Sequence, residues 1–448
     1  MSNLSDLIPA GGGQNNTDFV ASGALPNGSP VILNAAGTVT VVSQTSTPVS
    51  ESIPAGSEVV FNTADSQDND VSFDPNTSGK FVVVYTDQGN GGYSTAVVGT
   101  VSGTSITFGA EYTFTAASSE HTRVAFNPNT AGQFVAICKT GASDIGIAVI
   151  GTVTGTTIAF SASYTFDANR VEVMDLAFNA NVPDEFVVAY YQTTNTKGVA
   201  LVGTISGSTI SYGSLVTFNA DTTESVRVSF DTGSTNQFVV SYANPTNSNY
   251  GTSVVGTVAS TVITYGTVNV FASNNVAATA ISHDPHNSGK FVIAYNQVSS
   301  NAGKVLVGNV SGTTITYGTT YDVEASVNTA YVSVDFDPSV SNSIIIAYRP
   351  NATQGVAKVG TLSGTVVSLS AAKVFNAGQC RMISVKFNPS AQGQFVVAYR
   401  DDDNSNRGTA VTGQVATTII TSNLTATNLL GIASAAILDT ATGTINTW

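Results

Sequence analysis

The chain has 448 residues, of which 42% are hydrophobic and only 10% are charged. Its formal net charge of −14 and its sequence pI near 4.4 argue against a basic surface for DNA, RNA or anionic membranes, so we expect no nucleic-acid partner. The two cysteines are too few for a disulfide framework. No apolar stretch is long enough to insert into a membrane. The start, Met1–Asp6, lacks the features of a secretory signal, which predicts synthesis in a cytoplasm.

The two ends of the chain differ in composition from its middle. Residues 1–20 include three consecutive glycines and are expected to form an extended arm. Residues 21–57 and 422–448 each contain short strand-like segments separated by turn residues. We expect these two segments to form one small terminal β-module, with residues 58–421 inserted between its halves.

Residues 58–421 contain seven copies of a block of about 52 residues. Each copy opens with a marker residue, usually Phe, that is followed by Asp or Asn, and eight residues later a run such as Phe-Val-Val-Ala-Tyr begins. The markers are Phe73, Phe126, Phe178, Phe230, His283, Phe336 and Phe387. Repeats of this length with several short strands each predict an all-β fold, a seven-bladed β-propeller with four strands in each blade.

The run Phe81–Tyr85 is apolar at both odd and even positions, so both faces of this strand should be buried. A propeller blade is packed on both faces by its neighbours, whereas in a two-layer sandwich one face of each sheet is exposed to solvent. A glycine recurs inside the third strand, as at Gly99, and predicts either the close approach of another backbone or a bulge.

The fourth strand of the last copy lacks the bulky apolar residue that most other copies have there. A matching segment, Val59, Val60 and Phe61, precedes the first copy instead. We therefore expect this N-terminal strand to complete the last blade and to close the ring, which leaves no open edge to aggregate.

Charges of alternating sign occur three positions before the first four markers, at Asp70, Arg123, Asp175 and Arg227. We expect ion pairs across the seams between adjacent blades, near the inner strands. The alternative is a charged pore that holds a ligand. The Asp or Asn after each marker is expected to stabilise its own turn rather than to bind a ligand.

The sequence offers few candidate catalytic residues. The three histidines are His121, His283 and His286, and no Ser/His/Asp set or metal-ligand spacing can be assembled from them. We therefore predict that the chain is not an enzyme and has neither a cofactor nor a metal.

The loops after the second strands should all emerge on one face of the propeller, where a rigid scaffold presents binding residues. Tyrosines in these loops could stack on sugar rings, and acidic residues could accept hydrogen bonds from hydroxyl groups or bind Ca²⁺. The alternative is a solvated rim without a ligand. The residues expected to bind a glycan or receptor are Tyr93, Tyr191, Tyr250, Asp401, Asp402 and Asp403.

The terminal segments carry a resemblance. Leu4–Asn15, Asn27–Val31 and Leu430–Ala433 look like parts of virion proteins of marine tailed bacteriophages, namely tail fibre or structural proteins, and like the small β-barrel of capsid-decoration proteins. This resemblance implies a virion component that attaches to other virion proteins through residues 1–57 and 422–448, and an oligomer, often a trimer.

The resemblance predicts a virion protein, a tail fibre or adhesin whose propeller loops contact the host surface or its glycans. One alternative is a capsid-decoration protein that stabilises or ornaments the shell. A second alternative is a glycan-active propeller enzyme.

Overall fold

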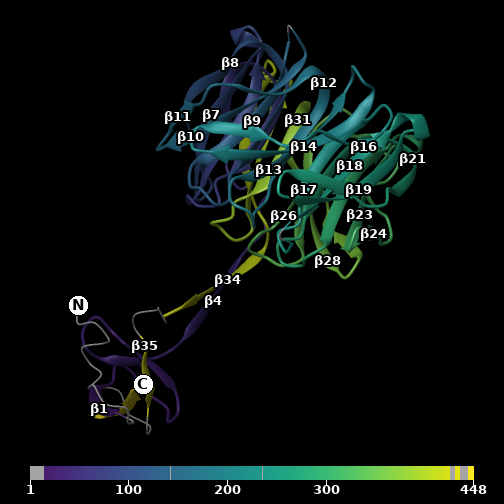
Figure 1. Cartoon of the computed structure of the whole chain (residues 1–448). Coiled ribbons are helices and arrows are strands. Elements are labelled where there is room, and N and C mark those ends of the chain that lie inside the picture. The colour runs from purple at the N-terminus through teal and green to yellow at the C-terminus, as the bar shows by residue number, and fades with distance from the viewer. Residues whose placement is uncertain (1–14, 142, 235, 424–428, 434–441, 448) are drawn as a thin grey trace. The chain divides into compact units, whose positions relative to one another are not determined.

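A computed structural model describes residues 15–141, 143–234, 236–423, 429–433 and 442–447. The chain divides into two compact units, a terminal unit of residues 1–49 with 416–448 and a central unit of residues 50–415 (Figure 1). The central unit is thus inserted, in sequence, between the two halves of the terminal unit. No helix among the described residues is long or apolar enough to cross a membrane.

The described part of the terminal unit contains seven short strands. These are β1 (Asn15–Val20), β2 (Pro30–Leu33), β3 (Val39–Val41), β4 (Gln44–Val49), β34 (Thr417–Ser422), β35 (Leu429–Ala433) and β36 (Thr442–Thr447). Five of them form one sheet in the order β1-β36-β35-β2-β3 around a small core that includes Val31, Val39 and Ile445, and β4 pairs with β34.

Two limits of this unit differ from those expected. Residues 15–20 are strand β1, hydrogen-bonded to β36, rather than part of an arm. The pairing of β4 with β34 keeps residues 44–49 and 417–422 in the terminal unit, so the central unit begins at residue 50 and ends at residue 415. Residues 1–14, which include most of the segment Leu4–Asn15, lie outside the described residues.

The pairings of the described strands of the central unit fall into seven antiparallel groups, which we number as blades 1 to 7 in chain order. Long strands run from the outer edge of one blade to the inner edge of the next. In order, the strands are β5 (Val59–Phe73), β6 (Lys80–Asp87), β7 (Tyr93–Ser102), β8 (Ser105–Phe126), β9 (Gln133–Thr140), β10 (Ile145–Thr154), β11 (Thr157–Phe160), β12 (Tyr164–Phe178), β13 (Glu185–Gln192), β14 (Lys197–Ser206), β15 (Thr209–Tyr212), β16 (Val216–Asn219), β17 (Glu224–Phe230), β18 (Gln237–Asn244), β19 (Tyr250–Ala259), β20 (Val262–Tyr265), β21 (Asn269–His283), β22 (Lys290–Gln297), β23 (Ala302–Ser311), β24 (Thr314–Tyr317), β25 (Tyr321–Glu324), β26 (Thr329–Phe336), β27 (Ser343–Pro350), β28 (Gly355–Ser363), β29 (Val366–Leu369), β30 (Lys373–Asn376), β31 (Cys380–Phe387), β32 (Gln394–Asp401) and β33 (Arg407–Gln414). Three single-turn 3₁₀ helices occur in loops, η2 (Gln88–Asn90), η3 (Pro245–Asn247) and η4 (Val298–Ser300).

The apolar cores lie between consecutive blades. In blade 1, Val82 and Val84 pack against blade 2, whereas Phe81, Val83 and Tyr85 pack against blade 7. The same division of the second strand recurs around the ring, so each blade buries both faces against its neighbours. The prediction of an all-β propeller is confirmed.

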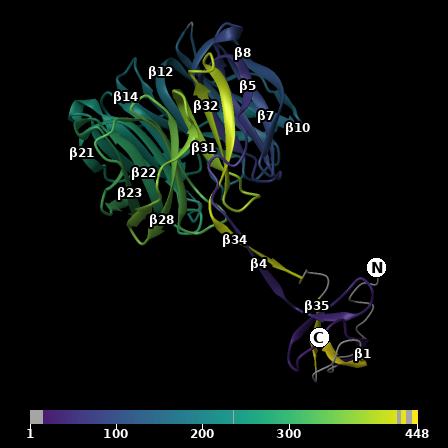
Figure 2. The same ribbon diagram turned by 180° about the vertical axis from the view of Figure 1, so that it is seen from behind.

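Strand β5 supplies the last strand of blade 7. Val59 lies opposite Ala410 and Val60 lies opposite Thr409 in β33, and Figure 2 shows β5 beside β31 and β32. Phe61 is buried, and its ring covers Gly408 in β33 so closely that a methyl group there would lie 2.3 Å from the ring. The N-terminal strand of the central unit therefore packs against the last blade.

The glycine inside the third strand has a reason beyond the two expected. The ring of the phenylalanine that opens the second strand lies directly over it: a methyl group on Gly99 would lie 2.1 Å from the ring of Phe81. The same contact pairs Gly203 with Phe186. The phenylalanine ring leaves no room for a side chain at either glycine, and at Gly99 the pairing with β8 also has the irregularity that was expected as a bulge.

Candidate functional site: a central cavity

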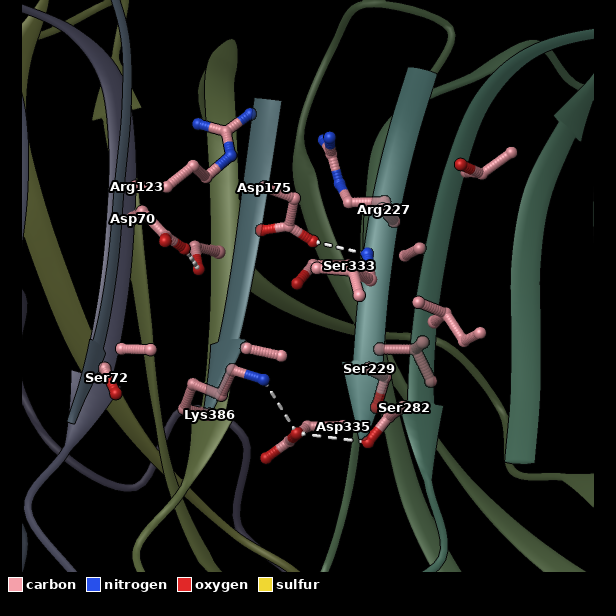
Figure 3. Close-up of a pocket in the computed structure, with 18 of the residues that line it drawn as sticks. Asp70, Ser72, Arg123, Asp175, Arg227, Ser229, Ser282, Ser333, Asp335 and Lys386 are labelled. Carbon is pink, nitrogen blue, oxygen red and sulfur yellow. Dashed lines mark hydrogen bonds and ion pairs between the residues drawn. The ribbon is translucent and has the colours of Figure 1, made fainter. Parts of the chain in front are cut away.

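A cavity of about 670 Å³ lies at the centre of the propeller. Its walls are the innermost strands of all seven blades, namely β5, β8, β12, β17, β21, β26 and β31. Side chains of these strands alternate, so that one set packs into the cores between blades while the other set faces the cavity (Figure 3).

Each of these strands carries a register shift a few positions before its marker. In six of them a residue other than glycine, such as Asp68 or His121, has a positive φ beside the shift. A bulge of this kind twists the strand and redirects the side chains that follow. The residues three positions before the markers come directly after these bulges and face the cavity.

Two rings of side chains line the cavity. The first ring lies three positions before the markers and consists of Asp70, Arg123, Asp175, Arg227, Ala280, Ser333 and Ser384. The second ring lies one position before the markers and consists of Ser72, Ala125, Ala177, Ser229, Ser282, Asp335 and Lys386. The charges of the first ring are on blades 1 to 4, and those of the second ring are on blades 6 and 7.

The four charged residues of the first ring were expected to form ion pairs across blade seams, and the structure contradicts this. No side-chain pair among them lies within ion-pair distance. Instead, the Asp70 carboxylate accepts the backbone N–H of Val124 at 3.0 Å, and the Asp175 carboxylate accepts that of Val228 at 2.9 Å. Innermost strands of adjacent blades do not share a β-ladder, so their inward N–H groups need side-chain acceptors.

Serines make the same link from blade to blade. Ser333 accepts the N–H of Val385 at 3.1 Å, and Ser384 accepts the N–H of Val71 at 3.3 Å. The second link joins blade 7 back to blade 1. Acceptor side chains of the first ring thus link neighbouring blades through hydrogen bonds.

The second ring contains a hydrogen-bonded network centred on Asp335. Lys386 donates to Asp335 at 3.0 Å, and the same carboxylate also accepts from Ser282 and from the N–H of Phe387 (Figure 3). Burial by itself lowers the pKa of Lys386, but Asp335 outweighs this and raises the pKa overall. Sequence reasoning missed this pair, because other copies have serine or alanine at this position and no charge recurs.

The two arginines of the first ring have no carboxylate partner among the described residues. One terminal nitrogen of Arg123 donates to the carbonyl of Thr122 at 2.7 Å, and one of Arg227 donates to that of Val226 at 2.8 Å. Both guanidinium groups lie on the side of the ring away from Lys386 (Figure 3). Burial, together with the nearby charge of Arg123, lowers the pKa of Arg227 to about 10, so it remains a cation at neutral pH.

The guanidinium side of the cavity belongs to the face on which the loops after the second strands emerge. This follows from register, because the starts of innermost strands pair with the ends of second strands, as Ser66 does with Asp87 and Cys380 does with Asp401. The expected binding tyrosines are on this face but do not line the cavity. Tyr93, Tyr191 and Tyr250 are half-buried on blades 1, 3 and 4.

The three acidic residues of the last loop have separate roles. Asp401 is buried, which raises its pKa. Asp402 pairs with Arg381 at 2.7 Å and with Arg400 at 3.3 Å, and Asp403 accepts the N–H of Gln379 at 3.0 Å. The described residues contain no group of three or more His, Cys, Asp and Glu side chains that could hold a metal ion.

A second charged cluster, which sequence reasoning also missed, joins blades 2 and 3. Buried Lys139 lies 2.7 Å from Glu120 and 2.9 Å from Glu172, and Glu172 also hydrogen-bonds His121 at 2.8 Å. The bond to His121 and the bond from Lys139 lower the pKa of Glu172 to about 2 against the opposing effect of burial. Every charge of this cluster has a partner, so it acts as a structural link.

No family model matches the chain, and no curated protein matches it. Solved structures that share the fold include a lectin and Sqt1. The BP39L lectin from Burkholderia pseudomallei is 10% identical, covers 80% of this chain and 99% of its own, and has a TM-score of 0.57. Sqt1 from Saccharomyces cerevisiae is 10% identical, covers 82% of this chain and 100% of its own, and has a TM-score of 0.51. At this identity both show the fold alone.

A third structure, the periplasmic gluconolactonase PpgL from Pseudomonas aeruginosa, is 10% identical and covers 79% of this chain and 98% of its own. Its TM-score of 0.47 is too low to carry an argument. The prediction that the chain is not an enzyme therefore stays a prediction.

These findings correct the expected function. The reading of the chain as a phage tail fibre is wrong, because the solved structures that share its fold include a lectin and Sqt1, and none of those compared indicates a virion role. The comparisons do not address the resemblance of the terminal segments to phage proteins, the virion location, or the implied partners and trimer.

Proposed function

We propose that the protein is a carbohydrate-binding propeller that takes a small saccharide into its central cavity and does not react with it. The observation that carries this proposal is the composition of the first ring. Carboxylates, guanidinium groups and hydroxyl groups are fixed at known positions around a cavity of about 670 Å³. This volume is within the range of about 300–1,000 Å³ that small-ligand pockets occupy.

Sugars suit this lining because each sugar hydroxyl both donates and accepts hydrogen bonds. The guanidinium groups of Arg123 and Arg227 offer donors, and the ring also contains acceptor oxygens. Tyr331 adds an aromatic ring to the wall, with Arg349 over it at 4.9 Å from the ring centre. The lectin name of BP39L is consistent with this ligand class, although that likeness concerns the fold.

The alternative, that the cavity is the active site of a glycan-cleaving enzyme, has less support. Asp175 and Asp70 both accept backbone N–H groups of the next blade, which gives these carboxylates a structural task. Burial raises the pKa of Asp175 despite the opposing charges of Arg227 and Arg123. We expect no cleavage when the protein is incubated with oligosaccharides and the products are separated by chromatography.

Saturation-transfer NMR with a panel of neutral and acidic monosaccharides tests the proposal. Ala280 belongs to the first ring and is buried, so Ala280→Trp should fill part of the cavity and abolish transfer. Tyr93→Ala, at the start of β7 and outside the cavity, is the matched control and should leave transfer unchanged. The proposal fails if no saccharide gives a signal with the native chain, or if Tyr93→Ala abolishes the signal and a folded Ala280→Trp keeps it.

A further inference from the structure

The first ring has more free donors than free acceptors. A guanidinium carries five N–H donors, and the described contacts of Arg123 and of Arg227 each use one nitrogen, bonded to a backbone carbonyl of the same strand. The remaining N–H groups of both side chains have no protein acceptor among the described residues. The ring therefore offers two guanidinium groups that make no direct ion pair with a described carboxylate, although Asp175 interacts electrostatically with both.

The acceptors of the same ring are largely occupied. One Asp70 oxygen accepts from Ser384 at 2.8 Å and the other accepts the N–H of Val124. One Asp175 oxygen accepts the N–H of Val228. The carboxylates therefore serve the links between blades and lie beside the arginines without pairing to them.

The backbone adds two further donors next to the arginines. Where the first ring has an aspartate or serine, that side chain accepts an N–H of the next blade. Arg123 and Arg227 occupy this position in their blades and offer no acceptor. No side-chain oxygen among the described residues accepts the N–H of Leu176 or of Ile281, which occupy the corresponding positions in the next blades. Donors therefore predominate on two sides of the first ring.

The cavity is open on the side of the two arginines that faces the second ring. The second ring has Ala125 on the strand of Arg123 and Ala177 on the next blade, and the first ring has Ala280 after Arg227. Small side chains at these positions leave room for a ring-shaped molecule. The cation of the second ring, Lys386, is already held by Asp335 and is on the other side of the ring (Figure 3).

We propose, on the basis of the carbohydrate-binding function above, that the ligand is an acidic saccharide whose carboxylate is held by Arg123 and Arg227. Guanidinium groups bind carboxylates through paired, charge-assisted hydrogen bonds that a neutral hydroxymethyl group cannot make. A hexuronic acid is the simplest such ligand, since it differs from its parent hexose only in that carboxylate.

Isothermal titration calorimetry of the full chain with sodium D-glucuronate and with D-glucose tests this proposal. Glucuronate should bind at least about tenfold more tightly than glucose, the ratio expected when charge-assisted hydrogen bonds replace neutral ones. Added NaCl should weaken glucuronate binding and leave glucose binding unchanged. Both measurements use the native chain, so they do not depend on a variant that folds.

Variants assign the effect to the two arginines. Arg123→Met with Arg227→Met should reduce glucuronate binding to the level of glucose, and Arg123→Lys with Arg227→Lys should restore only part of the preference, because lysine lacks the paired donors. Arg170→Met is the matched control, since this exposed arginine pairs with Asp144 and does not line the cavity. It should keep the full preference.

Each contrary outcome has a separate meaning. Equal affinities for glucuronate and glucose would overturn the acidic ligand and leave the carbohydrate-binding function standing. Acetate or sulfate binding as tightly as glucuronate would show an adventitious ion only, and would also overturn it. Absence of binding by every saccharide would remove the function on which the proposal rests.

Discussion

Replacing Phe61 by alanine tests the closure of the ring most simply. The Phe61 side chain is only 6% exposed, and its ring centre lies 5.2 Å from that of Tyr85 and 5.6 Å from that of Phe108. Truncation of a phenylalanine buried in this way costs about 3–5 kcal/mol. Phe61→Ala should therefore lower the free energy of unfolding by about that amount in urea titrations followed by circular dichroism.

The control is the equivalent contact in the middle of the chain. Phe218 is also 6% exposed and covers Gly198 as Phe61 covers Gly408, so Phe218→Ala should cost a similar free energy. Hydrogen exchange separates the two variants, because only Phe61→Ala should expose the amides of β33 that pair with β5. A loss below about 1 kcal/mol, or full protection of β33 in Phe61→Ala, would refute the reasoning.

Three further predictions concern stability. Burial lowers the pKa of His283 to about 4, although Asp231 and Asp284 act in the opposite direction. The unfolded chain therefore binds this proton more readily than the native chain, and the free energy of unfolding falls as the pH drops from 6.5 toward 4. His283→Phe, which restores the residue of the other repeats, should remove this loss of at most about 3 kcal/mol, measured by urea unfolding across that range; an unchanged pH dependence would contradict it. Asp74→Ala should cost about 1–3 kcal/mol, because the carboxylate accepts the N–H of Gly132 in the next blade at 2.8 Å, and an unchanged urea midpoint would count against that link. Gly151→Ala should lower the melting temperature, since the added methyl would lie 2.0 Å from the Phe134 ring, and a melting temperature at or above that of the native chain would exclude the clash.

The sequence predicted the propeller because the spacing and the apolar pattern of its repeat recur along the chain. The apolar run Phe81–Tyr85 indicated burial on both faces, and the lack of a bulky apolar residue in the fourth strand of the last copy indicated that Phe61 belongs there. Spacing and apolarity are local properties, so a repeat displays them directly.

The cavity could be predicted only in part, because its chemistry depends on contacts between blades. Alternating signs at Asp70 and Arg123 indicated ion pairs, but the sequence does not show that inward N–H groups compete for the carboxylates. The bulges before the first ring had no glycine to mark them. Lys386 and Asp335 interrupt the repeat at one position and therefore gave no periodic signal.

A crystal structure of the full chain with D-glucuronate would test the central claim most directly. We predict that the sugar lies in the cavity with its carboxylate between the guanidinium groups of Arg123 and Arg227. A sugar bound instead at Tyr93 or Tyr250, at the starts of β7 and β19, would contradict the claim. So would a cavity without sugar when the ligand is saturating in solution.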